Sequence, residues 1–87
     1  MNINIDEIKD GDKIVVERTL NDGDEDYQTK EYYLAKQEGN ELALYYHNGF
    51  REIKYTWELV MMNADCSYKV DEFPDYVNVF FMRMWGK

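Results

Sequence analysis

The chain has 87 residues, of which 45% are hydrophobic and 16% aromatic, and this composition predicts one small packed domain over residues 1–87. Eighteen acidic residues against ten basic ones give a net charge of −8, which excludes direct binding to a nucleic-acid backbone or an anionic membrane surface. One cysteine excludes an internal disulfide and no apolar run could span a membrane, so we expect a cytoplasmic protein.

The first two strands are expected on either side of an acidic segment. Residues 13–20 are rich in β-branched side chains and alternate apolar with polar positions, with Ile14, Val16 and Leu20 on one face. Residues 30–37 form the second expected strand. The segment between them, NDGDEDYQTKE at residues 21–31, is expected to be a solvated hairpin connection.

Two further strands complete an expected four-stranded meander. Residues 41–47 follow a short turn at Gly39, and either register of that turn places Tyr33 on the face of Leu44. Asn48-Gly49 is the preferred pair for a two-residue type I′ turn, which needs positive φ at both positions, and it predicts a hairpin in which Leu44 faces Ile53. Alternation from residue 52 to residue 61 predicts one long fourth strand.

The last third of the chain fits two interpretations. No element is predicted over residues 63–75, which contain turn-forming residues and Pro74. Residues 76–85 read as a strand put Val77, Val79, Phe81 and Trp85 on one face, whereas a helix groups Val77, Phe80, Phe81 and Met84. We favour the strand for its β-branched and aromatic content. The expected fold is mainly β, an antiparallel four- to five-stranded meander or SH3-like barrel, with an α+β sheet carrying one C-terminal helix as the alternative.

Metal and catalytic motifs fail on their spacing. Asp22, Asp24 and Asp26 fit positions one, three and five of a calcium loop, but tyrosines occupy the positions that need glycine and glutamate. His47 and Cys66 are too few ligands for a zinc site and form no nucleophilic triad with an orienting group. We therefore expect no enzyme, no metal and no cofactor.

The candidate binding surface combines carboxylates with tyrosines. Carboxylates pair with Arg and Lys through charge-assisted hydrogen bonds, and tyrosine rings attract the same cations through cation–π contacts. Tyr32 and Tyr45, with Tyr27 as a further candidate, are expected on the face opposite Tyr33; alternatively they fill a covered second face of the sheet. The expected partner-binding residues are Asp22, Asp24, Glu25, Asp26, Tyr27, Glu31, Tyr32, Tyr45 and Glu52.

In size, acidity and lack of catalytic residues the chain resembles small phage-encoded inhibitors of host defence, including anti-CRISPR proteins and DNA mimics. It is equally similar to acidic immunity proteins that neutralise nuclease toxins. The resemblance rests on composition and implies an inhibitor that docks on a basic, nucleic-acid-binding surface of a partner. The alternatives are a small β-barrel that reads cationic peptides or small ligands through Tyr32, Tyr45 and Trp57, and a homo-oligomer formed through residues 77–85.

Overall fold

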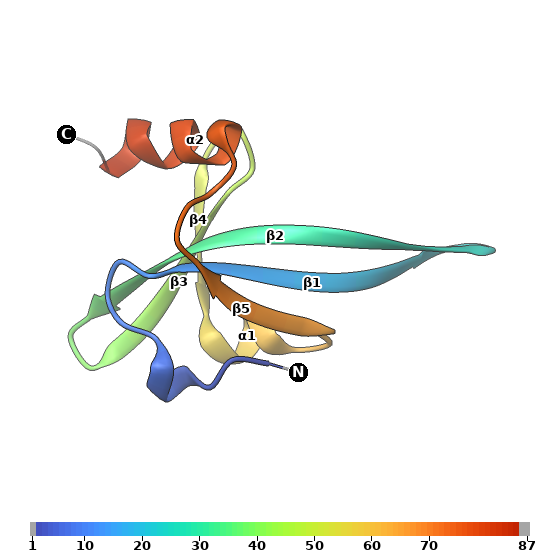
Figure 1. The fold of residues 1–87 in the computed structure, drawn as a ribbon, viewed down its shortest axis with the longest axis horizontal. Helices are drawn as coiled ribbons and strands as arrows, with labels where there is room; N and C mark the ends of the chain where they lie inside the picture. Colours follow the sequence, from blue (N-terminus) through green and yellow to red (C-terminus); the bar gives the residue numbers. More distant parts are fainter. Residues whose placement is uncertain (1, 86–87) are drawn as a thin grey trace.

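The computed structural model describes residues 2–85, and among residues 83–85 only the backbone. Five antiparallel strands form one sheet in the order β4-β3-β2-β1-β5, with a short helix and a C-terminal helix beside it (Figure 1). The mainly-β prediction is confirmed, and the C-terminal helix of the alternative is present. The elements are η1 (Ile5–Glu7), β1 (Lys13–Asp22), β2 (Glu25–Glu38), β3 (Glu41–His47), β4 (Glu52–Thr56), α1 (Trp57–Met61), β5 (Cys66–Val70) and α2 (Asp75–Trp85).

The main core lies on the sheet face that the sequence pattern predicts. The strand residues of this core occupy every second position along their strands, so their side chains all point to the same face of the sheet. Helix α1 and the segment after η1 cover this face through Val60 and Ile8, and each buried aliphatic side chain contributes about 1.5–3 kcal/mol. The strand members of the core are Ile14, Val16, Tyr33, Ala35 and Leu44.

The opposite face of the sheet is covered by α2 and the segment before it. Phe73, Val77 and Phe81 form a second cluster against Tyr32 and Tyr45, among other side chains of the sheet. The rings of Phe73 and Phe81 stack with centroids 5.4 Å apart, and Tyr32 meets Phe73 edge-on at 5.9 Å. The sheet therefore has apolar layers on both faces.

The type I′ turn predicted at Asn48-Gly49 is wrong. Gly49 has a positive φ but Asn48 does not, and a four-residue loop joins β3 to β4. The Asn48 side chain accepts hydrogen bonds from the backbone N–H groups of Phe50 and Arg51 (2.8 and 3.0 Å), which stabilises the wider loop. Tyr46 rather than Leu44 therefore faces Ile53, a shift of two positions that leaves every side chain on its predicted face.

The long fourth strand is also wrong, because β4 ends at Thr56 and α1 follows. The Thr56 hydroxyl accepts from the backbone N–H of Leu59 at 3.3 Å, which caps the first turn of α1. Helical spacing then buries Val60, which is 2% exposed, and leaves Leu59 52% exposed. The alternating letters of residues 57–61 are equally compatible with this short helix, so periodicity could not separate the two.

The strand favoured for residues 76–85 is wrong as well. The segment is α2, and Pro74 begins it by accepting hydrogen bonds at its carbonyl from Val77 and Asn78 (3.0 and 2.9 Å). The fifth strand is instead β5, inside the segment for which no element was predicted, and it pairs with β1. Trp85 was expected on the strand face and Met84 on the helix face, and both side chains lie outside the part of the chain that the structure describes.

Candidate functional site

The hairpin of β1 and β2 projects from the body of the molecule as a two-stranded arm (Figure 1). Strand β5 pairs with β1 only up to Glu17, and β3 pairs with β2 only from Tyr33 onward. We call residues 18–29 the arm. Residues 19–28 are exposed on both faces, so this part of the arm is not packed into either core. A hairpin without a buried face contributes little to stability, which makes the arm a candidate for contact with another molecule.

The tip of the arm carries four carboxylates around a two-residue turn, Gly23-Asp24, in which Gly23 has a φ of +70°. Asp22 lies directly opposite Glu25, an arrangement of like charges that costs free energy within the hairpin. By strand alternation these two project from one face of the arm and Asp26 from the other. The tip is therefore acidic on both faces and at its end.

An apolar pair lies next to the acidic tip. Leu20 and Tyr27 are direct cross-strand partners, and they are 40% and 48% exposed. Both lie on the same face of the arm as Asp22 and Glu25. An exposed aromatic–aliphatic pair beside carboxylates offers a partner both apolar area and charge.

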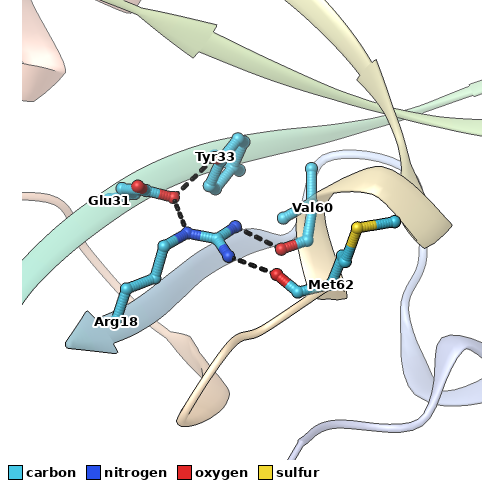
Figure 2. A network of polar contacts seen from close by, with 5 residues as sticks. All are labelled: Arg18, Glu31, Tyr33, Val60 and Met62. Atoms are coloured by element: carbon cyan, nitrogen blue, oxygen red, sulfur yellow. Dashed lines mark hydrogen bonds and ion pairs between the residues drawn. The ribbon is translucent and has the colours of Figure 1, made fainter. Parts of the chain in front are cut away.

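Arg18 holds the base of the arm to the body (Figure 2). Its Nε donates to a Glu31 carboxylate oxygen at 2.8 Å, and the Tyr33 hydroxyl donates to the same oxygen at 2.8 Å. Its two terminal nitrogens donate to the backbone carbonyls of Met62, at 2.7 Å, and Val60. These carbonyls lie at the C-terminal end of α1, where unpaired carbonyls favour a cation.

A second set of contacts holds the base of the same strand, β1, to β5 and the segment before it. The Thr19 hydroxyl donates to the Asp65 carboxylate, and the Asp65 backbone N–H donates to the carbonyl of Glu17 at 2.8 Å. The Tyr68 hydroxyl donates to the Glu17 carboxylate at 2.7 Å, and this hydrogen bond raises the pKa of Tyr68 to about 12. The arm is thus tied to α1 on one side and to β5 on the other.

The structure brings only part of the predicted binding set together. Asp22, Asp24, Glu25, Asp26 and Tyr27 form the tip of the arm, whereas Glu31 lies at its base in the Arg18 contacts. The candidate placement of Tyr27 on the face opposite Tyr33 is wrong. Strand β2 runs unbroken from residue 25 to residue 38, so its odd-numbered residues share one face.

The remaining predicted residues lie on the α2 side of the sheet. Tyr32 meets Phe73 and Tyr76 edge-on, and Tyr45 packs against the same apolar layer while its hydroxyl donates to Glu38. Glu52 pairs across from His47 at the start of β4, two strands away from β2. Trp57 packs on the opposite face, in the main core, so Tyr32, Tyr45 and Trp57 do not line one pocket.

Metal-ligating and nucleophilic side chains are the other chemistry-bearing groups of residues 2–85. Within residues 2–85, no three His, Cys, Asp or Glu side chains are arranged to hold a metal ion. Cys66 lines an open hollow of about 420 Å³ with Asn2 and Tyr68 among its neighbours. Desolvation and the nearby Glu17 carboxylate raise the pKa of the Cys66 thiol, which disfavours the thiolate that a nucleophile needs. Over the same residues, no helix is long and apolar enough to cross a membrane.

Sequence reasoning missed Arg18 and Leu20 as parts of the site. Arg18 interrupts the apolar series Ile14, Val16 and Leu20, and a charged residue at such a position signals a bonded partner nearby. No protein-family model matches the chain, and neither a curated protein nor a solved structure does.

Proposed function

We propose that this protein is a small non-enzymatic binding protein that inserts its acidic arm into a positively charged groove of a partner protein. The observation that carries the proposal is the form of the arm: a projecting hairpin with carboxylates on both faces and at its end. A tip that is acidic all round suits insertion between two basic walls better than contact with one flat surface.

The proposed mechanism follows from the negative charge of the arm and from its projection beyond the body of the protein. Where the groove normally holds nucleic acid, the arm excludes that ligand by occupying its site, which is the mode of an anti-defence inhibitor, a DNA mimic or a nuclease immunity protein. Carboxylates at alternate strand positions recur about 6.6–7 Å apart, a spacing that successive Arg and Lys side chains can meet. The pair Leu20 and Tyr27 adds apolar contact that salt does not screen.

The test compares two variants of equal net charge. One neutralises the arm tip (D22N/D24N/E25Q/D26N), and the other neutralises four exposed carboxylates of the body (E41Q/E58Q/D71N/E72Q). A partner is captured from lysate with the wild type at low salt, identified, purified and titrated with each form. We expect the arm variant to bind the partner at least about tenfold more weakly, because it loses a few charge-assisted contacts. The body variant should keep the wild-type affinity.

The decisive measurement is displacement. If wild-type protein releases labelled nucleic acid from the captured partner and the arm variant does not, the exclusion mechanism holds. If both variants bind and displace like the wild type, or if the partner binds independently of salt, the arm is a solvated turn and the proposal fails.

A second candidate function is self-association through α2. Its outer side exposes Tyr76, Val79 and Met82, and the neighbouring loop exposes Phe50 at 94%. The end of β3 and this loop lie against the helix: His47 stacks on Phe80 with ring centroids 4.9 Å apart, and Gly49 adjoins the same Phe80 ring. Exposed apolar side chains in such a group favour a contact between copies. Sedimentation of the wild type and of F50S/M82S checks it, and a monomeric wild type at micromolar concentration would remove the candidate.

A further inference from the structure

The arm leaves one edge of β2 open to another strand. Strand β3 pairs with β2 from Tyr33 to Glu38 only, so residues 25–31 have β1 on one side and, among the described strands, none on the other. The backbone N–H and C=O groups of an open edge are able to bind a further strand.

The register identifies the backbone groups that point outward. A two-residue turn closes on a hydrogen-bonded pair, here Asp22 and Glu25, and such pairs alternate along an antiparallel ladder. The odd-numbered residues of β2 therefore bond to β1, in agreement with the bonds of Ala35 to Asp12 and Gly11 on that side (2.9 and 2.8 Å). It follows that Asp26, Gln28 and Lys30 direct their N–H and C=O groups outward.

The other edge of the arm, formed by β1, is covered at its base by the segment before β5. On β1 the outward-pointing residues are odd-numbered, and the Glu17 carbonyl already accepts from Asp65. The Asp65 carboxylate also accepts from the Thr19 hydroxyl, so the segment before β5 lies along this edge. Asn21 is the one outward-pointing residue of β1 left beyond these contacts. The edge of β2 thus offers three such residues against one.

Charge selects the occupant of this edge. Five carboxylates and one cation lie within residues 22–31, so a second copy of the arm would be repelled, and pairing of Gln28 with Gln28 would set Glu25 against Glu31. We propose, on the basis of the proposed docking function, that the arm binds an extended basic segment of its partner by adding it as an antiparallel strand along Asp26, Gln28 and Lys30. Alternate Arg or Lys side chains of that segment then lie over Glu25 and Tyr27.

The experiment uses a blocked seven-residue peptide of alternating arginine and threonine, titrated into the full chain at low salt. NMR hydrogen exchange follows each backbone amide. We expect the amides of Asp26, Gln28 and Lys30 to become protected and that of Asn21 to stay unprotected. A peptide of the same sequence with N-methylated threonines keeps the charge but lacks the backbone N–H donors that face Asp26, Gln28 and Lys30, so it should protect none of them.

Two proline variants separate backbone pairing from charge. Proline is tolerated on an edge where the N–H faces solvent, so Q28P removes one outward donor from the β2 edge and N21P one from the β1 edge. We expect Q28P to weaken peptide binding about fivefold or more, the value of one net hydrogen bond or above, and N21P to change it less than about twofold.

The possible results differ for the two proposals. Equal binding of the peptide to wild type and Q28P, or equal binding of the N-methylated peptide, overturns strand addition but leaves charge-driven docking intact. Strand addition is also overturned if the peptide protects none of the amides of Asp26, Gln28 and Lys30 from hydrogen exchange. The same holds if the wild-type protein dimerises without peptide and the dimer protects the Gln28 amide. Docking itself is then judged by the displacement measurement, which needs no peptide.

Discussion

Arg18 stands in the alternating series of β1, after Ile14 and Val16, at a position that points toward the main core. Its side chain is 15% exposed and bonds Glu31 and the two carbonyls at the end of α1. Removing a largely buried cation leaves both carbonyls without this donor and the Glu31 carboxylate with the Tyr33 hydroxyl but no cation. That penalty exceeds the value of a surface ion pair.

We expect Arg18→Met to lower the free energy of unfolding by roughly 2 kcal/mol, because methionine keeps the apolar stem and loses the donors. Urea denaturation measures the change. Arg51, which is exposed in the β3–β4 loop, supplies the control, and Arg51→Met should stay within about 0.5 kcal/mol. Equal losses for the two variants would contradict the role assigned to Arg18.

Tyr68 gives the fold a dependence on alkaline pH. Its hydrogen bond to Glu17 raises its pKa to about 12, above the usual value of 10.0, and a raised pKa stabilises the fold only while the hydroxyl keeps its proton. That contribution is complete below pH 10 and is lost as the pH rises toward about 12. Unfolding measured at about pH 9 and about pH 11.5 should show a smaller alkaline loss for Tyr68→Phe than for wild type. A loss of the same size in both would exclude this group.

At the scale of elements, α2 shows how burial overrides local preference. Val77 and Val79 would share a face of a strand, but in the helix Val77 is 6% exposed and Val79 is 45% exposed. Residues 76–85 favour a strand by composition, yet β5 already occupies the edge beside β1. The helix covers the second sheet face, including Tyr32 and Tyr45.

This pair of valines supplies a matched test of the element. Val77→Ala should lower the free energy of unfolding by roughly 2 kcal/mol, because it removes two buried methyl groups and leaves a cavity. Val79→Ala should change it by less than about 0.5 kcal/mol. Thermal or urea unfolding of both variants checks the difference, and similar losses would fit a strand rather than α2.

For the whole molecule, the lopsided charge concentrates on the arm. Residues 1–31 hold ten acidic and four basic residues, and four of those acids surround the arm tip. Because the tip is exposed and contains like charges side by side, we expect its carboxylates to contribute little to the stability of the fold.

Neutralising the tip should therefore leave the fold intact. We expect D22N/D24N/E25Q/D26N to unfold at the same free energy as wild type or up to about 0.5 kcal/mol higher, with a weaker dependence on salt between about 0.02 M and 0.5 M. Calorimetry at the two salt concentrations measures both effects. A clear loss of stability would mean that the tip contributes to the fold, and the binding assay with this variant would then lose its meaning.

Local pattern was sufficient for what depends on period two. The alternation of β1 to β3 predicted the meander and its core face, because alternation depends only on neighbouring residues along one strand. The acidic segment, whose spacing does not fit a calcium loop, was predicted as a hairpin connection from its own residues. Contacts between distant segments decided the rest. The burial of Val60 in the main core, the pairing of β5 with β1 and the second apolar layer under α2 select among local patterns of nearly equal preference. Arg18 joins the arm to α1 across 42 residues of chain, a contact that no local pattern contains.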